Sequence, residues 1–140
     1  MKIFLIILIF LSMAVGGCQQ ERISSTNEDC AAIKITSTLD TLTSVDMFSI
    51  KEAMVSGNTL RLTFAYGGGC DPNHSFELYL KPTQNIDANT SNFEGRVVFH
   101  TQDYCKRLDT KSFCFDLTSL KKGANSIQIK IQGFGEVIGF

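Results

Sequence analysis

The sequence predicts an all-β domain, an antiparallel immunoglobulin-like β-sandwich of about seven strands. Two observations carry this prediction: apolar residues alternate with polar ones in several stretches, and turn-forming residues separate those stretches. The domain has no stretch with the apolar stripe, repeating every three or four residues, that marks an amphipathic helix. An oligonucleotide-binding-type barrel and a jelly roll are the alternative architectures.

The expected strands follow one another from Ile33, where the alternation begins. It is clearest in the run that ends at Tyr66 and in the run around Phe115. After the first stretch, the expected strands are 48–55, 60–66, 76–80, 96–101, 113–117 and 127–131. Turns are expected at 56–58, 67–69 and 122–125, which are rich in Gly, Asn and Ser. The longest unpatterned stretch, 82–95, is expected to cross between the two sheets as in a Greek key.

The N-terminus has the pattern of a secretory signal. Lys2 precedes an apolar run, 3–14, that is too short to cross a bilayer comfortably. The run ends in Val-Gly-Gly-Cys at 15–18, which resembles the bacterial lipobox, where a peptidase cleaves before a cysteine that carries lipid. We expect residues 1–17 to be a signal peptide and Cys18 to be lipidated. The alternatives are an uncleaved apolar anchor and an ordinary signal peptide.

The remaining chain divides into a tether and one domain. Residues 18–32 are mostly polar and are expected to form a flexible tether, and 33–140 the sandwich. The formal net charge of −1 provides no basic field for a nucleic acid, so we expect none as a partner. The lipid itself, with more than one acyl chain on Cys18, is expected to supply the membrane affinity.

Four cysteines remain after Cys18, an even number in a chain exported to an oxidising space, so disulfides are expected. Counting strand directions places the loops that hold Cys70 and Cys105 at one end of the sandwich, and this favours a disulfide between them. The same count places Cys114 at that end, so a Cys105–Cys114 link is the rival. Elimination pairs Cys30 with Cys114, although Cys30 reaches that end only if the segment 33–44 crosses over.

The segment 67–78, Gly-Gly-Gly-Cys-Asp-Pro-Asn-His-Ser-Phe-Glu-Leu, is the most distinctive stretch. Together with Asp103-x-Cys105 and the strand 115–117, it resembles small envelope lipoproteins of the Bacteroidota type, which are mostly of unknown function. This resemblance covers roughly 60–131. It implies a β-sandwich in the envelope and carries over no catalytic residue. The triplet Asp40-Thr41-Leu42 of this chain resembles the O-glycosylation signal of the same bacteria, in which the hydroxyl residue is modified.

Two chemical alternatives centre on the same segment. Cys70, His74 and Cys105, with His100 as a further candidate, offer thiolate and imidazole ligands for zinc or copper. Ser75, His74 and Asp71 supply the residue types of a hydrolytic triad, but neighbours in one turn seldom point at one another. We therefore expect no catalytic residue, no resident metal and no cofactor.

The predicted function is that of a lipid-anchored envelope protein with a non-enzymatic binding or structural domain. The alternative is a metal-binding or hydrolytic activity centred on Cys70 and His74. The expected partners are the membrane, through the lipid, and a protein or glycan that Tyr66, Tyr79 and Tyr104 could contact. Gln19 is not the aspartate that retains enterobacterial lipoproteins at the inner membrane, so the outer membrane is the expected location. The sequence does not indicate whether the domain faces the periplasm or the cell surface.

Overall fold

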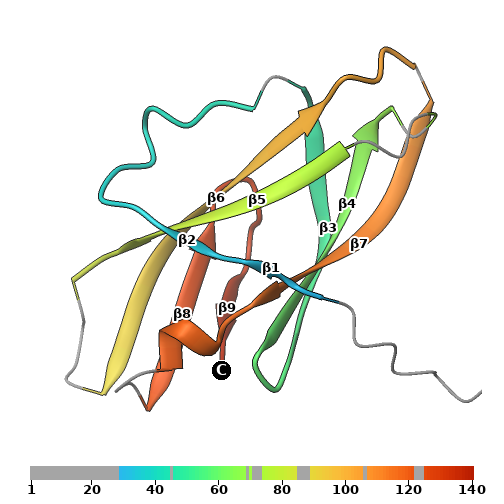
Figure 1. Cartoon of the computed structure of the whole chain (residues 1–140). Coiled ribbons are helices and arrows are strands. Elements are labelled where there is room, and N and C mark those ends of the chain that lie inside the picture. Colours follow the sequence, from blue (N-terminus) through green and yellow to red (C-terminus); the bar gives the residue numbers. More distant parts are fainter. Residues whose placement is uncertain are drawn as a thin grey trace, which may run out of the picture.

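The protein is described by a computed structural model that covers residues 29–44, 46–68, 70, 74–84, 89–105, 107–121 and 125–140. The expected signal peptide, Cys18 and all but the last four residues of the expected tether lie outside these residues. Nine strands and one short 3₁₀ helix form within them (Figure 1). The strands are β1 (Ala31–Ala32), β2 (Lys34–Ile35), β3 (Phe48–Ser56), β4 (Thr59–Gly67), β5 (His74–Pro82), β6 (Thr90–Thr101), β7 (Leu108–Asp116), β8 (Ser126–Ile131) and β9 (Val137–Gly139), and the helix is η1 (Thr118–Lys121).

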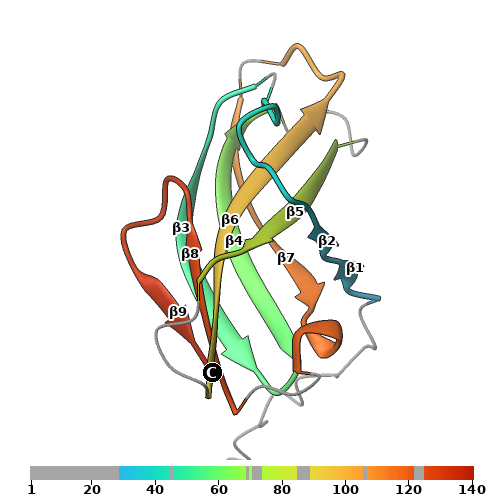
Figure 2. The same ribbon diagram turned by 90° about the vertical axis from the view of Figure 1, so that its left-hand side faces the viewer.

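The strands form two sheets that face each other (Figures 1 and 2). One sheet has the order β1-β7-β4-β3 and the other has the order β2-β5-β6-β8-β9. The all-β prediction is confirmed, but the expectation of a wholly antiparallel sandwich needs correction, because both sheets are mixed. The pairs β1–β7, β2–β5 and β6–β8 are parallel. The immunoglobulin-like arrangement stays a prediction.

The predicted inward-facing residues form the core. Every second residue of β4, from Leu60 to Tyr66, is buried, and β5 and β8 show the same alternation. Between the sheets, the Phe64 ring stacks on Phe76 with centroids 4.0 Å apart, and Phe76 stacks on Phe99 with centroids 4.5 Å apart. The period of two in the sequence therefore reports which face of each strand is buried, because successive side chains point to opposite faces.

The expected crossover at 82–95 is wrong. The strand β5 extends to Pro82 and β6 begins at Thr90, and the two are antiparallel neighbours in one sheet, so this stretch joins adjacent strands instead of crossing between sheets. Glycine is common in turns, yet Gly95 lies within β6, where side chains of the two neighbouring strands occupy the space beside its Cα. A Cβ atom there would lie 3.0 Å from Leu80 and 3.2 Å from Ile131. Glycine is thus the residue that lets these two core side chains approach β6.

The segment 30–44 connects both sheets. β1 pairs with the last two residues of β7, and β2 then pairs with β5 in the other sheet. The chain next crosses to β3 through a turn that buries Leu39 and that Arg96 holds by donating hydrogen bonds to the carbonyls of Leu39 and Leu42. Residues 30–32, assigned to the tether from sequence, therefore belong to the sandwich.

Candidate functional site

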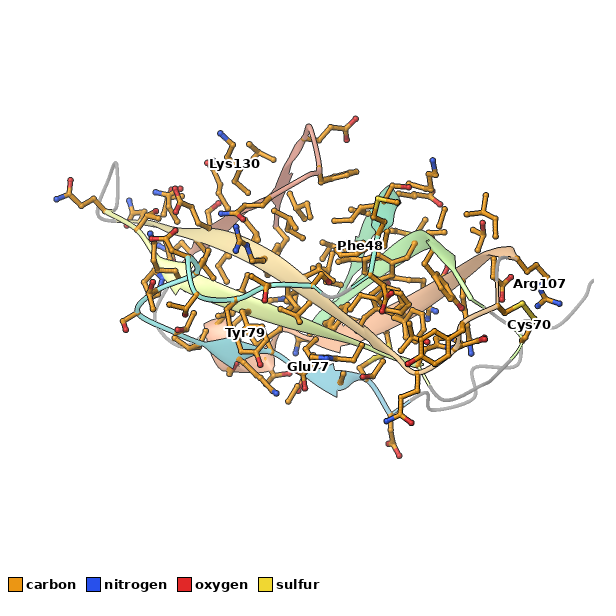
Figure 3. The ribbon with its side chains drawn as sticks, turned by 90° about the horizontal axis from the view of Figure 1, so that it is seen from above. Phe48, Cys70, Glu77, Tyr79, Arg107 and Lys130 are labelled. Atoms are coloured by element: carbon orange, nitrogen blue, oxygen red, sulfur yellow. A yellow bond between two sulfur atoms is a disulfide. The ribbon has the colours of Figure 1, made fainter. Side chains whose placement is uncertain are left out.

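The loops at one end of the sandwich form the candidate site. The β4–β5 connection and the β6–β7 connection meet there, and a disulfide joins Cys70 of the first to Cys105 of the second. Figure 3 shows Cys70 and Arg107 close to each other at this end. The disulfide pairs the cysteines that strand counting favoured, because β4 and β6 both run toward this end. Two loops, each of which runs from one sheet to the other, are thus linked covalently.

The Asp103 carboxylate fixes the backbone on both sides of this disulfide. Its Oδ2 atom accepts a hydrogen bond from the Cys70 amide at 2.8 Å, and its Oδ1 atom accepts one from the Cys105 amide at 2.8 Å. Gly68, with a φ of 119°, donates its amide to the Arg107 carbonyl at 2.9 Å. Only glycine adopts that φ without strain, so Gly68 lets β4 turn beneath Asp103. Hydrogen bonds to a carboxylate are among the stronger ones, so Asp103 holds the backbone at Cys70 and Cys105 together beside their disulfide.

A groove of about 560 Å³ opens beside these loops. We call it the loop-end groove, and residues 46–49, 65–67, 103–105 and Leu108 line it. The starts of β3 and β7 and the end of β4 contribute to it, as does the disulfide-bound loop. A volume of this size is within the ordinary range of ligand pockets, which is about 300 to 1,000 Å³. The groove can therefore hold one or two side chains of a bound molecule.

The groove is apolar at its rim and acidic in charge. Met47, Tyr104 and Leu108 are 91%, 97% and 74% exposed, and all three line it. Asp46 and Asp103 are the charged residues in the lining, and no Lys, Arg or His is among the described lining residues. The arrangement suits contact with an apolar group next to a positive charge, and no nucleophile–base pair lies in the described lining.

The sequence alternative of a metal or hydrolytic site at Cys70 and His74 is not supported by the geometry. Cys70 is half of a disulfide, so it offers no thiolate for a metal. The Nε2 atom of His74 lies 2.7 Å from the hydroxyl of Tyr66 and forms a hydrogen bond with it. Asp71 lies outside the described residues. Within the described part of the chain, no group of three or more His, Cys, Asp or Glu residues is placed to hold a metal ion.

Tyr66 has a structural role rather than the contact role considered from sequence. Its side chain is 1% exposed, packs against Phe76 and Phe99, and ends in the hydrogen bond to His74. Burial raises the pKa of its hydroxyl, and the nearby Asp109 carboxylate raises it further, while Arg107 lowers it. The neutral hydroxyl is therefore the form that links β4 to β5 beneath the loop end.

The second disulfide lies at the opposite end of β7. Cys30 is bonded to Cys114, with Cα atoms 4.8 Å apart, beside the short pairing of β1 with Phe115 and Asp116. The placement of Cys114 at the Cys105 end was wrong, because β7 begins at Leu108, six positions earlier. Three consecutive polar residues, Asp109, Thr110 and Lys111, interrupt the apolar alternation, so the sequence pattern does not predict this part of the strand. Consequently the rival Cys105–Cys114 link does not form.

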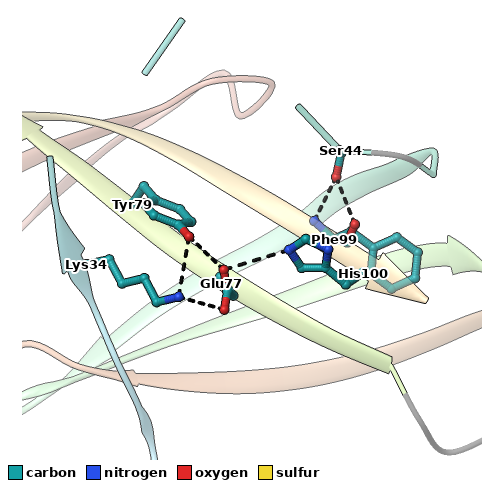
Figure 4. Close-up of polar contacts among 6 residues, drawn as sticks. All are labelled: Lys34, Ser44, Glu77, Tyr79, Phe99 and His100. Atoms are coloured by element: carbon teal, nitrogen blue, oxygen red, sulfur yellow. Dashed lines mark hydrogen bonds and ion pairs between the residues drawn. The ribbon is translucent and has the colours of Figure 1, made fainter. Parts of the chain in front are cut away.

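A polar network covers the outer face of the second sheet (Figure 4). Lys34 donates to Glu77 at 2.7 Å and Tyr79 donates to the same carboxylate at 2.8 Å, while His100 lies 3.8 Å from it. The hydrogen bonds from Lys34 and then Tyr79 lower the pKa of Glu77, and the bond to Glu77 raises the pKa of Lys34. Since Lys34 is in β2, the network ties this two-residue edge strand to β5. Tyr79 thus takes part in sheet packing.

The network predicts an acid-dependent contribution to stability. The pKa of Glu77 is lower in the folded state, so its stabilising effect is present above about pH 4.5 and is lost as the pH falls through the folded value. We expect Glu77→Gln to make the unfolding free energy less sensitive to pH below about 4.5. Urea unfolding followed by circular dichroism at a series of pH values measures this. Tyr79→Phe removes one of the two donors and should give an intermediate result.

Some acid dependence should remain in Glu77→Gln, because hydrogen bonds from Thr118 also lower the pKa of Asp116. An acid dependence identical to that of the wild type would show that the Glu77 network does not form in solution.

Two further sequence candidates, Thr41 and Ser75, lie outside the groove lining. Thr41 is exposed in the turn that follows Leu39, and Ser75 is exposed at the start of β5. Tyr104 is the one tyrosine of the three that is exposed in the groove lining. Sequence analysis missed Asp46, Met47 and Leu108. Leu108 could have been suspected of an exposed position, because it is an apolar residue between two charged ones and lies outside the expected strands.

No helix in the described part of the chain has both the length and the apolar character needed to cross a membrane. No family model matches the sequence. No curated protein matches it either.

Solved structures show that the fold occurs elsewhere. The chain is similar to a protein of unknown function, DUF1344, from Bacteroides vulgatus, with a TM-score of 0.50 and 15% identity over 79% of this chain and 56% of that one. It is also similar to a NigD-like immunity protein from Bacteroides caccae, with a TM-score of 0.51 and 11% identity over 79% of this chain and 58% of that one. The chain thus spans somewhat more than half of each. At these identities the likeness shows a shared β fold.

Proposed function

We propose that this protein is a lipid-anchored lipoprotein of the bacterial outer membrane whose sandwich is a non-enzymatic binding module. The lipobox-like sequence at 15–18 supports the anchor. The apolar, acidic lining of the loop-end groove supports a binding role, because it offers contact surface rather than reactive groups. The separation of the attachment point from the groove, along β7, is the observation that carries the proposal.

The two disulfides define the two ends of the module. Cys30 is covalently fixed to the last part of β7, so the chain that leads back to Cys18 joins the sandwich there. Leu108, at the first residue of β7, lies in the groove lining. Leu108 and Cys114 are six positions apart on this strand, which corresponds to about 20 Å. Figures 1 and 2 agree that β1 lies well away from the loop between β6 and β7. A domain tethered through Cys30 can therefore present the groove away from the membrane.

The Cys30–Cys114 bond also suits an anchored protein. A pull on the tether reaches Cys30 first and passes through the disulfide into β7, in the middle of a sheet, instead of peeling off the two-residue β1. Covalent attachment to a paired strand makes the domain resist local opening at its attachment point.

Replacement of Cys18 by Ser tests the anchor. We expect this variant to take up no alkyne-labelled fatty acid and to leave the membrane fraction or accumulate uncleaved, because the thiol that carries the lipid is gone. Metabolic labelling followed by gel fluorescence measures this. The double variant Cys30→Ala/Cys114→Ala is the matched control, since it loses cysteines but keeps Cys18 and should keep its label. Equal label on wild type and Cys18→Ser would contradict the proposal.

A further inference from the structure

We propose that the loop-end groove binds an extended segment of a partner protein in which an apolar side chain stands next to a lysine or arginine. This inference builds on the proposed binding function and names the chemistry of the partner. Four features carry it: the exposed apolar rim, the charge of the lining, the neighbouring edge strand, and the position of the tether.

The rim explains the apolar side chain. Met47, Tyr104 and Leu108 are 74% to 97% exposed, whereas the other exposed large apolar side chains of the described residues, Ile35, Met54 and Val137, are 54% to 57% exposed and lie outside the lining. Clustered exposure of this kind on one hollow surface marks an interaction site. Tyr and Met are enriched in protein interfaces, where they supply large and adaptable contact area. A partner side chain that enters the groove removes this surface from water.

The lining explains the positive charge. Asp46 and Asp103 contribute carboxylates, and no basic side chain is among the described residues that line the groove. A lysine or arginine of the partner would thus meet complementary charge, whereas an acidic partner would be repelled.

The edge strand explains the extended shape. β3 ends the order of its sheet, and within the described residues no strand pairs with its outer edge. The groove lies across the face of this sheet, where residues of β3, β4 and β7 line it, so it reaches the first residues of the edge strand. A register shift between Ile50 and Glu52, at Lys51, interrupts the strand, and such bulges with lysine protect edges from pairing. The unprotected part of the edge is thereby limited to the first residues of β3, and a segment that lies extended across the groove can leave it over this edge and pair with them.

Other occupants fit less well. Residues 19–28 of this chain hold Arg22 next to Ile23, but they connect the lipid attachment expected at Cys18 to Cys30, which lies at the far end of β7 from the groove. A second copy in a symmetric contact would bring the carboxylates of two acidic grooves together. A membrane surface would have to reach the end opposite the tether and would meet the same carboxylates, so an extended basic and apolar peptide is the occupant.

Selection from a random nine-residue peptide phage library against the full-chain protein in lipid nanodiscs tests the proposal. We expect selected peptides to combine Lys or Arg with Phe, Leu or Val, and to bind the wild type about tenfold more tightly than Tyr104→Ser/Leu108→Ser. Asp46→Asn should weaken binding severalfold and reduce its dependence on salt. Met54→Ser is the matched control, because Met54 is 55% exposed on β3 outside the groove lining, and it should bind as the wild type does.

Hydroxyl-radical footprinting identifies the occupant. Met47 and Tyr104 should be oxidised readily in the anchored protein and be protected by a selected peptide, while oxidation of Met54 stays unchanged. Protection of Met47 and Tyr104 before any peptide is added would show that lipid or a second copy covers the groove, and would overturn the proposal. Acid-rich peptides, no selected peptides, or equal binding to the groove variant would also overturn it. Fatty-acid labelling of Cys18 tests the lipid anchor independently of peptide binding. The proposal of a lipid anchor and the proposal of a peptide partner can therefore fail separately.

Discussion

Replacing Phe115 with Ala is expected to lower the unfolding free energy by about 3 to 5 kcal/mol, the usual cost of truncating a buried aromatic residue. Phe115 is 0% exposed and belongs to the main core cluster. It faces Leu60 across the β4–β7 pair and Ala31 across the β1–β7 pair. Loss of the ring leaves a cavity that three strands border, and paired strands cannot move in to fill it.

Urea unfolding followed by circular dichroism measures this change. Leu108→Ala on the same strand is the control, because Leu108 is mostly exposed and its truncation should change stability by no more than about 0.5 kcal/mol. Similar unfolding midpoints for wild type and Phe115→Ala would mean that this face of β7 is not the core.

Removal of the Cys30–Cys114 disulfide is expected to have an effect of similar size. The bond closes a separation of 84 residues, of which the Cys70–Cys105 bond already bypasses 35. On the chain-entropy model, opening the loop that remains costs on the order of 4 kcal/mol. Cys30→Ala/Cys114→Ala should therefore unfold at clearly lower urea concentration. β1, with only two paired residues, should also lose its contact with β7.

Two measurements check this expectation. Non-reducing peptide mapping of the wild type should recover Cys30 linked to Cys114 and Cys70 linked to Cys105. Hydrogen exchange of the double variant should show the amides of Ala31 and Ala32 losing protection, while the hydrogen-bonded amides of Gly68, Cys70 and Cys105 keep theirs. A peptide that links Cys105 to Cys114 would contradict the strand positions. Unchanged stability of the double variant would mean that the sheets alone hold the N-terminal segment.

The groove could be predicted only in part. The glycine run at 67–69 and the Asp103-x-Cys105 motif marked the right end of the domain, because turn chemistry and cysteine spacing are local features. Asp46, Met47 and Leu108 come from other parts of the chain and meet Tyr104 only when β3, β4 and β7 lie side by side. No local pattern encodes that meeting.

The sequence by itself determined the all-β class, the inward faces of β4, β5 and β8, and the end at which Cys70 and Cys105 meet. The alternation of apolar and polar residues and the turn residues are local features of the sequence, so strands and turns can be predicted from them without knowledge of the fold. The tertiary structure alone decided the parallel pairs, the strand character of 90–95 and the place of Cys114 at the far end of β7. These features depend on which strands become neighbours, and that choice follows from packing between residues far apart in the chain.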